Sequence, residues 1–86
     1  MHIDVEPSVE NLGKQIEFEV GESGAYISMG FSKKFSGKNA NIYVEGEYLF
    51  TATVGRKGEI RVSKDSEIGK SLIRTIAGRR EIKVFV

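Results

Sequence analysis

The sequence contains no cysteine and a single histidine, His2. Disulfide bonds and thiolate metal sites are therefore excluded. One histidine near a chain end does not supply a histidine-based metal site or a Ser-His-Asp triad. No set of residues is typical of a nucleophile with its base, so we expect no enzymatic activity, no cofactor and no small-molecule substrate.

Long apolar stretches are also missing. No run of 18 or more apolar residues occurs and no signal-peptide pattern opens the chain, so we expect no membrane association and a cytoplasmic location. The 86 residues are expected to form a single domain, 1–86, with a modest core. Because disulfides are excluded, association with a second copy is the most natural further source of stability, and we expect a homodimer.

Charge is distributed unevenly, although the net charge is only +1. Residues 1–50 contain four Lys or Arg and eight Asp or Glu, a net charge of −4. Residues 51–86 contain nine and four, a net charge of +5. This asymmetry indicates either an anionic partner for the basic half or neutralisation of one half by the other, in the fold or across a dimer.

Alternating apolar residues predict strands over most of the chain. In the clearest early strand, Ile16, Phe18 and Val20 are expected on one face, and a turn at 21–24 leads to a returning strand at 25–29. Further strands are predicted at 41–44, 48–54, 59–62 and 81–86. Residues 1–14 form an N-terminal segment, in which Ile3 and Val5 suit a short edge strand and 7–13 suit a single helical turn or a compact loop.

One helix is predicted over 65–77 in the second half. Ser63 or Asp65 suits its N-cap, and Gly78 suits its end. Apolar residues with helical spacing form a stripe that is expected to face the core: Ile68, Leu72 and Ile76, with Ile73 and Ala77 beside them.

An internal repeat relates the two halves of the chain. A shift of 34 positions superposes Ile16, Phe18 and Val20 on Phe50, Ala52 and Val54, with Gly21 on Gly55 and Gly24 on Gly58. Beyond these hairpins the match requires gaps, so chance similarity of two hairpins stays an alternative. The repeat predicts two ββαβ-like units, 15–44 and 45–86, that interlock to bury their apolar faces. The predicted fold is mostly β with one main helix, a small closed β-barrel.

Several short motifs carry a family resemblance. The stretches are Val44-Glu45-Gly46, Leu49-Phe50, Val54, Gly58-Glu59-Ile60-Arg61-Val62-Ser63-Lys64, Gly69-Lys70 and Ile82-Lys83-Val84. Together they resemble the AbrB/MazE-type swapped-hairpin domain. The sequence departs from that family at Ser63, where proline is usual, and in the length of its helix. These departures leave open a related cradle-loop barrel of the RIFT or double-psi type.

The resemblance implies a homodimeric DNA-binding regulator that lays basic hairpins against the major groove. The matching positions are Arg56 and Lys57 at the turn, Arg61 on the returning strand and Lys64 at its end. Such cations neutralise phosphates, and arginine also binds guanine. The alternatives are a solvated, charged sheet face and a non-catalytic interaction or assembly module that binds an acidic protein surface.

Two further stretches bear on whether the chain binds DNA or a nucleotide phosphate. The first hairpin carries Glu22-Ser23 where the second carries Arg56-Lys57, so it is expected to repel DNA. The Gly69-Lys70-Ser71 sequence ends like a phosphate-binding loop, but Lys64 occupies the position of the required earlier glycine. The acidic first hairpin therefore leaves two alternatives: one half of the chain reads DNA and the other supports it, or neither half does.

Overall fold

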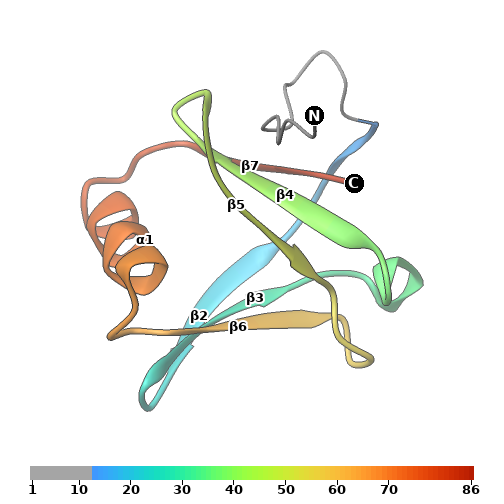
Figure 1. Ribbon diagram of the computed structural model, residues 1–86, viewed down its shortest axis with the longest axis horizontal. Coiled ribbons are helices and arrows are strands. Elements are labelled where there is room, and N and C mark those ends of the chain that lie inside the picture. Colours follow the sequence, from blue (N-terminus) through green and yellow to red (C-terminus); the bar gives the residue numbers. More distant parts are fainter. Residues whose placement is uncertain (1–12) are drawn as a thin grey trace, which may run out of the picture.

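The computed structural model describes residues 13–86, which form a compact arrangement of strands with one α-helix (Figure 1). The elements are β1 (Gln15–Ile16), β2 (Glu19–Ser23), β3 (Tyr26–Gly30), the 3-10 helix η2 (Lys33–Phe35), β4 (Asn39–Val44), β5 (Glu47–Thr53), β6 (Glu59–Ser63), α1 (Glu67–Ala77) and β7 (Ile82–Phe85). The prediction of a mostly β fold with one main helix is confirmed. Nearly all of the predicted N-terminal segment, 1–14, lies outside the described residues.

The strands form two antiparallel sheets. Sheet A has the order β1-β7-β4-β5, and sheet B has the order β2-β3-β6. Residues 17–18 join β1 to β2, so one interrupted strand contributes to both sheets. Among the described residues β5 and β6 share a turn but no ladder of paired residues. The sheets are not closed into a barrel, and the predicted closed barrel is not confirmed.

Most strand pairing joins the first half of the chain to the second. The second strands of the two halves pair as β3 with β6, and the third strands pair as β4 with β7. The remaining pairings between halves are β1 with β7 and β4 with β5, each of which joins a first strand to a third. These four pairings between halves are unchanged when the two halves are exchanged, whereas the β2–β3 pairing within the first half has no counterpart between β5 and β6 among the described residues.

The first hairpin differs from its prediction. β2 continues through Gly21, which pairs with Ser28, and the turn consists of Gly24 and Ala25, with Gly24 at a φ of +58°. The predicted turn at 21–24 is wrong. The superposition of Gly21 on Gly55 also fails, because Gly55 lies in a turn. Val20 is 38% exposed rather than in the core, because the interruption at 17–18 separates β2 from the buried part of the strand.

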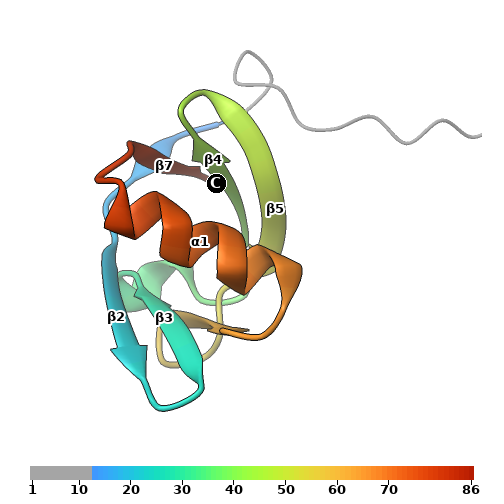
Figure 2. The same cartoon turned by 90° about the vertical axis from the view of Figure 1, so that its left-hand side faces the viewer.

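The core fills the space between the two sheets, and α1 covers this space at one end of the molecule (Figures 1 and 2). Its largest fully buried side chains come from both halves: Ile27, Met29, Ile42, Val54, Leu72 and Val84. Within residues 13–86 no helix is both long enough and apolar enough to cross a membrane.

The helix begins two residues later than predicted. Ser66 is the N-cap, and its Oγ accepts a hydrogen bond of 2.9 Å from the Gly69 N–H. Neither Ser63 nor Asp65 caps the helix, since Ser63 Oγ accepts from the Asp65 N–H ahead of it. Gly78 ends the helix as predicted.

The buried face of α1 is also rotated from the predicted stripe. Gly69, Leu72 and Thr75 are buried, whereas Ile73 and Ile76 are 37% and 41% exposed. A Cβ on residue 69 would overlap the Ser63 carbonyl. Glycine at this position therefore allows the buried face of α1 to lie directly against the backbone at Ser63. The Thr75 hydroxyl tolerates burial because it donates a 2.8 Å hydrogen bond to the Ser71 carbonyl.

Candidate functional site

The turn between β5 and β6 presents the two predicted turn cations to solvent. The Gly58 N–H donates to the Gly55 carbonyl at 2.9 Å, and the Gly55 N–H donates to the Glu59 carbonyl at 2.9 Å. These bonds define a tight turn whose tip is Arg56 and Lys57, both exposed. Gly58 has a φ of +79°, a conformation that favours glycine.

A second segment, 31–38, lies directly against this turn. The Phe31 N–H donates to the Gly58 carbonyl at 2.6 Å, and Ser36 Oγ donates to the Arg56 carbonyl at 3.2 Å. A Cβ on Gly58 would lie 2.5 Å from the Phe31 carbonyl oxygen, so the two backbones are in close contact. This contact fixes the position of the segment relative to the turn.

The segment 31–38 brings three further cations to the turn. Together the exposed side chains form a surface that we call the basic end: Lys33, Lys34, Lys38, Arg56 and Lys57. None of the five belongs to an ion pair among the described residues. The basic end lies opposite α1 in the molecule (Figure 1).

The three lysines were missed as site residues at the sequence level, since they belong to the half of the chain with net negative charge. Their local signal was the concentration of three lysines between 33 and 38, while the same half has just one other lysine, Lys14. Only the hydrogen bonds between 31–38 and the turn connect this signal to Arg56 and Lys57.

Arg61 lies apart from the basic end, on the outer face of sheet B. It is exposed while Ile60 is 5% exposed, in agreement with the predicted alternation. Its guanidinium carbon lies 4.5 Å from the centre of the Tyr26 ring, and Tyr26 is itself 43% exposed. The arginine is therefore held over an aromatic ring by a cation–π interaction.

Lys64 lies at the other end of β6, next to the start of α1. Its Nζ is 3.5 Å from Glu22 Oε1, in an ion pair between the two halves of the chain. The four predicted site residues therefore do not form one cluster. Arg56 and Lys57 share the basic end, Arg61 lies in the middle of β6, and Lys64 is partnered at the opposite end.

Metal ligands do not gather within residues 13–86. The described Asp and Glu residues form no group of three that could hold an ion. The Gly69-Lys70-Ser71 sequence lies inside α1, in agreement with its rejection as a phosphate-binding loop.

Comparison with known proteins gives one informative match. The chain is 33% identical over 63 residues to an uncharacterized KH and PIN-domain containing protein of Methanocaldococcus jannaschii. The match covers 73% of this chain but 10% of that protein, so the chain spans about a tenth of its relative. No protein family matches the chain, and no solved structure is detectably similar to it.

Proposed function

We propose that this protein binds DNA as an AbrB-like transcription regulator, with its basic end against the phosphate backbone. The observation that carries the proposal is the contact between 31–38 and the Gly55–Gly58 turn, which gathers five cations, none of them in an ion pair among residues 13–86. Unpaired Lys and Arg side chains release condensed counterions when they meet phosphates, and this release drives association.

The geometry of the turn supports the proposal in a second way. The hydrogen bonds from Phe31 and Ser36 hold the turn backbone in place. The turn backbone therefore loses little further conformational entropy when it binds a partner. Arg56 at the tip has the planar donor fork that recognises guanine in the major groove. Arg61 extends the proposed surface along sheet B, whereas Lys64 would have to exchange Glu22 for a phosphate.

The named domains of the relative provide weaker support. A KH domain clamps the nucleic-acid backbone with a Gly-X-X-Gly loop. The Gly55-Arg56-Lys57-Gly58 turn has this spacing, although it joins two strands and the likeness is limited to the loop.

DNA binding also agrees with the cytoplasmic location expected from the sequence.

The proposed architecture is the swapped-hairpin or cradle-loop arrangement. Its support is the pairing of β3 with β6 and of β4 with β7, which interlocks two units of similar strand order. We also propose a homodimer that joins two copies through α1, because Ile73 and Ile76 are large apolar side chains left partly in solvent. Because α1 and the basic end lie at opposite ends of the molecule, such a dimer would carry one basic end at each of its two extremities.

Titration of a DNA duplex at several salt concentrations tests the function. If all five cations meet phosphates, log Kobs falls with log salt concentration with a slope of about −4.5. Affinity then drops about 500-fold between 50 and 200 mM salt. The double variant Arg56→Ala/Lys57→Ala should reduce the slope to about −2.7.

The matched control is Lys70→Ala/Arg74→Ala, which removes the same charge from exposed positions of α1 at the opposite end. It should leave the slope unchanged. If the two double variants reduce the slope equally, the contact is not located at the basic end. If the parent protein does not bind duplex DNA even at low salt, the proposed function is wrong.

A protein-assembly module is the second candidate function. The observations that favour it are the exposed Ile73 and Ile76 and the Lys64–Glu22 ion pair, which shows an attraction between the basic and acidic halves. Under this alternative Arg56→Ala/Lys57→Ala would weaken binding to an acidic protein surface, and the parent protein would not bind duplex DNA. The duplex titration separates the two candidates directly.

A further inference from the structure

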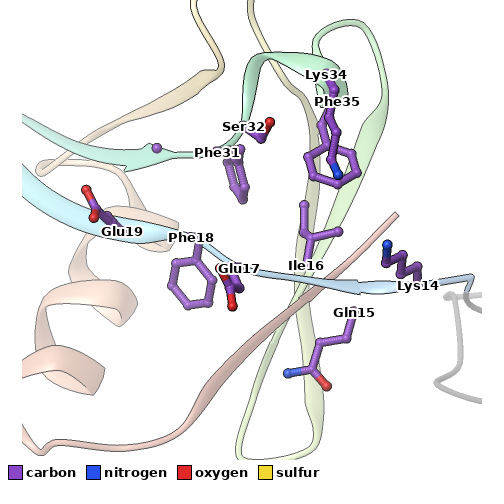
Figure 3. A pocket seen from close by; sticks show the side chains of 11 residues that line it. Lys14, Gln15, Ile16, Glu17, Phe18, Glu19, Phe31, Ser32, Lys34 and Phe35 are labelled. Atoms are coloured by element: carbon purple, nitrogen blue, oxygen red, sulfur yellow. The ribbon is translucent and has the colours of Figure 1, made fainter.

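A groove of about 1080 Å³ opens beside the basic end, between the interrupted strand β1–β2 and the segment 31–35 (Figure 3). Its floor includes Ile16, which is 5% exposed. The rings of Phe31 and Phe35 extend from the segment toward the strand that carries Ile16. The groove therefore offers half-buried aromatic rings to a ligand at the surface.

The aromatic residues of the groove are arranged as a set. Phe18 lies on the strand side, with its ring centre 6.4 Å from that of Phe31. Phe18, Phe31 and Phe35 are all partly buried against the core, which keeps the rings in place. Aromatic rings held at a groove surface are the usual partners of unstacked bases.

Charge on the two sides of the groove differs in sign. On the segment side, Lys34 belongs to both the groove and the basic end, and its Nζ lies 5.2 Å from the centre of the Phe35 ring. On the strand side, Glu17 and Glu19 are exposed, with Lys14 beyond them. A phosphate is attracted to the lysine side, whereas the carboxylates can accept hydrogen bonds from the amino group of a base.

We infer that this groove receives an unpaired base, and that the preferred ligand is single-stranded DNA whose phosphates follow the basic end. The inference rests on the part of the proposed function that brings DNA phosphates to the basic end, and it replaces the duplex by a single strand as the preferred ligand. Bases inside a duplex are stacked on one another and cannot enter the groove, whereas bases of a single strand can stack on Phe31 and Phe35. The groove volume is slightly above the range typical of small-ligand sites, enough for a base and its sugar.

The test compares a single-stranded oligonucleotide, a duplex of the same sequence, and the same single strand with one central abasic position. The single strand should bind at least 10-fold more tightly than the duplex. Phe31→Leu keeps an apolar side chain but removes the ring, and it should weaken single-strand binding by about 5- to 160-fold while duplex affinity is retained. The abasic strand should bind the parent protein less tightly and should be less sensitive to Phe31→Leu.

Tyr48→Leu is the matched aromatic control, since Tyr48 lies at the start of β5 and does not line the groove. Circular dichroism and thermal unfolding verify that each variant is folded, and Phe35→Leu replaces Phe31→Leu if the latter is not. Equal affinity for single strand and duplex, or single-strand binding unaffected by either phenylalanine variant, overturns the inference. Duplex binding with the predicted salt slope leaves the proposed function standing in that case, whereas loss of all DNA binding removes both.

Discussion

Gly58 is the residue of the basic turn that lies in contact with the segment 31–38, and Gly58→Ala tests the importance of this contact. Two features of the structure oppose a side chain there. The φ of +79° is unfavourable for alanine, and the new Cβ would lie 2.5 Å from the Phe31 carbonyl oxygen. Gly37 isolates the first feature, because it has a φ of +83° and nothing within 4 Å of an added Cβ.

The two variants should differ in their free energy of unfolding. The left-handed backbone costs an alanine about 1 kcal/mol at either position. At Gly58 the overlap also displaces the Phe31 backbone, which weakens the 2.6 Å hydrogen bond to the Gly58 carbonyl. That bond contributes about 1 kcal/mol, and overpacking adds a further ~1 kcal/mol. We expect losses of about 3 kcal/mol for Gly58→Ala and about 1 kcal/mol for Gly37→Ala.

Urea denaturation monitored by circular dichroism measures both losses. A difference of about 2 kcal/mol is large for a domain whose total stability is about 5–15 kcal/mol. Equal losses in the two variants would refute the reasoning, because they would show that 31–38 moves away from the turn without penalty. The folded fraction of Gly58→Ala should also show a smaller salt slope for DNA, since its lysines are no longer held beside Arg56.

Three other predictions concern α1. Ser66→Ala removes the N-cap and should lower stability by about 1 kcal/mol, whereas Ser71→Ala should change it by no more than about 0.5 kcal/mol in the same urea assay. Leu72→Ala should lower stability by about 2–5 kcal/mol and Ile73→Ala by less than about 1 kcal/mol; similar values would contradict the observed face of the helix. Ile73→Lys/Ile76→Lys should convert the proposed dimer into a folded monomer in light scattering, and a parent protein that is already monomeric would rule the dimer out.

Local patterns predicted the elements well where burial on one face was regular. The alternation that placed Ile60 inside and Arg61 outside is confirmed, and so is the helix end at Gly78. The N-cap was not predictable in the same way, because Ser63, Asp65 and Ser66 are all good capping residues. The choice among them follows from the close approach of Gly69 to the Ser63 carbonyl, a contact that no local pattern contains.

The extent of the candidate site depended on contacts between distant segments. Dividing the charge by halves assigned Lys33, Lys34 and Lys38 to the acidic half, away from Arg56 and Lys57. Their actual neighbours are fixed by backbone bonds such as those between Gly37 and Val54 and between Val54 and Lys38. Lys64 shows the opposite case, since it is near Arg61 in sequence but forms an ion pair with Glu22 from the other hairpin.

The pairing of strands from one half of the chain with strands from the other has a consequence for the order of folding. Of the five strand pairings among residues 13–86, four join the first half to the second, and only β2–β3 forms within a half. A nascent chain that ends near Val44 can therefore form one hairpin and little else. Formation of the core must wait until β7 has been synthesised, and the large sequence separation of the β1–β7, β3–β6 and β4–β7 pairings makes the final step slow.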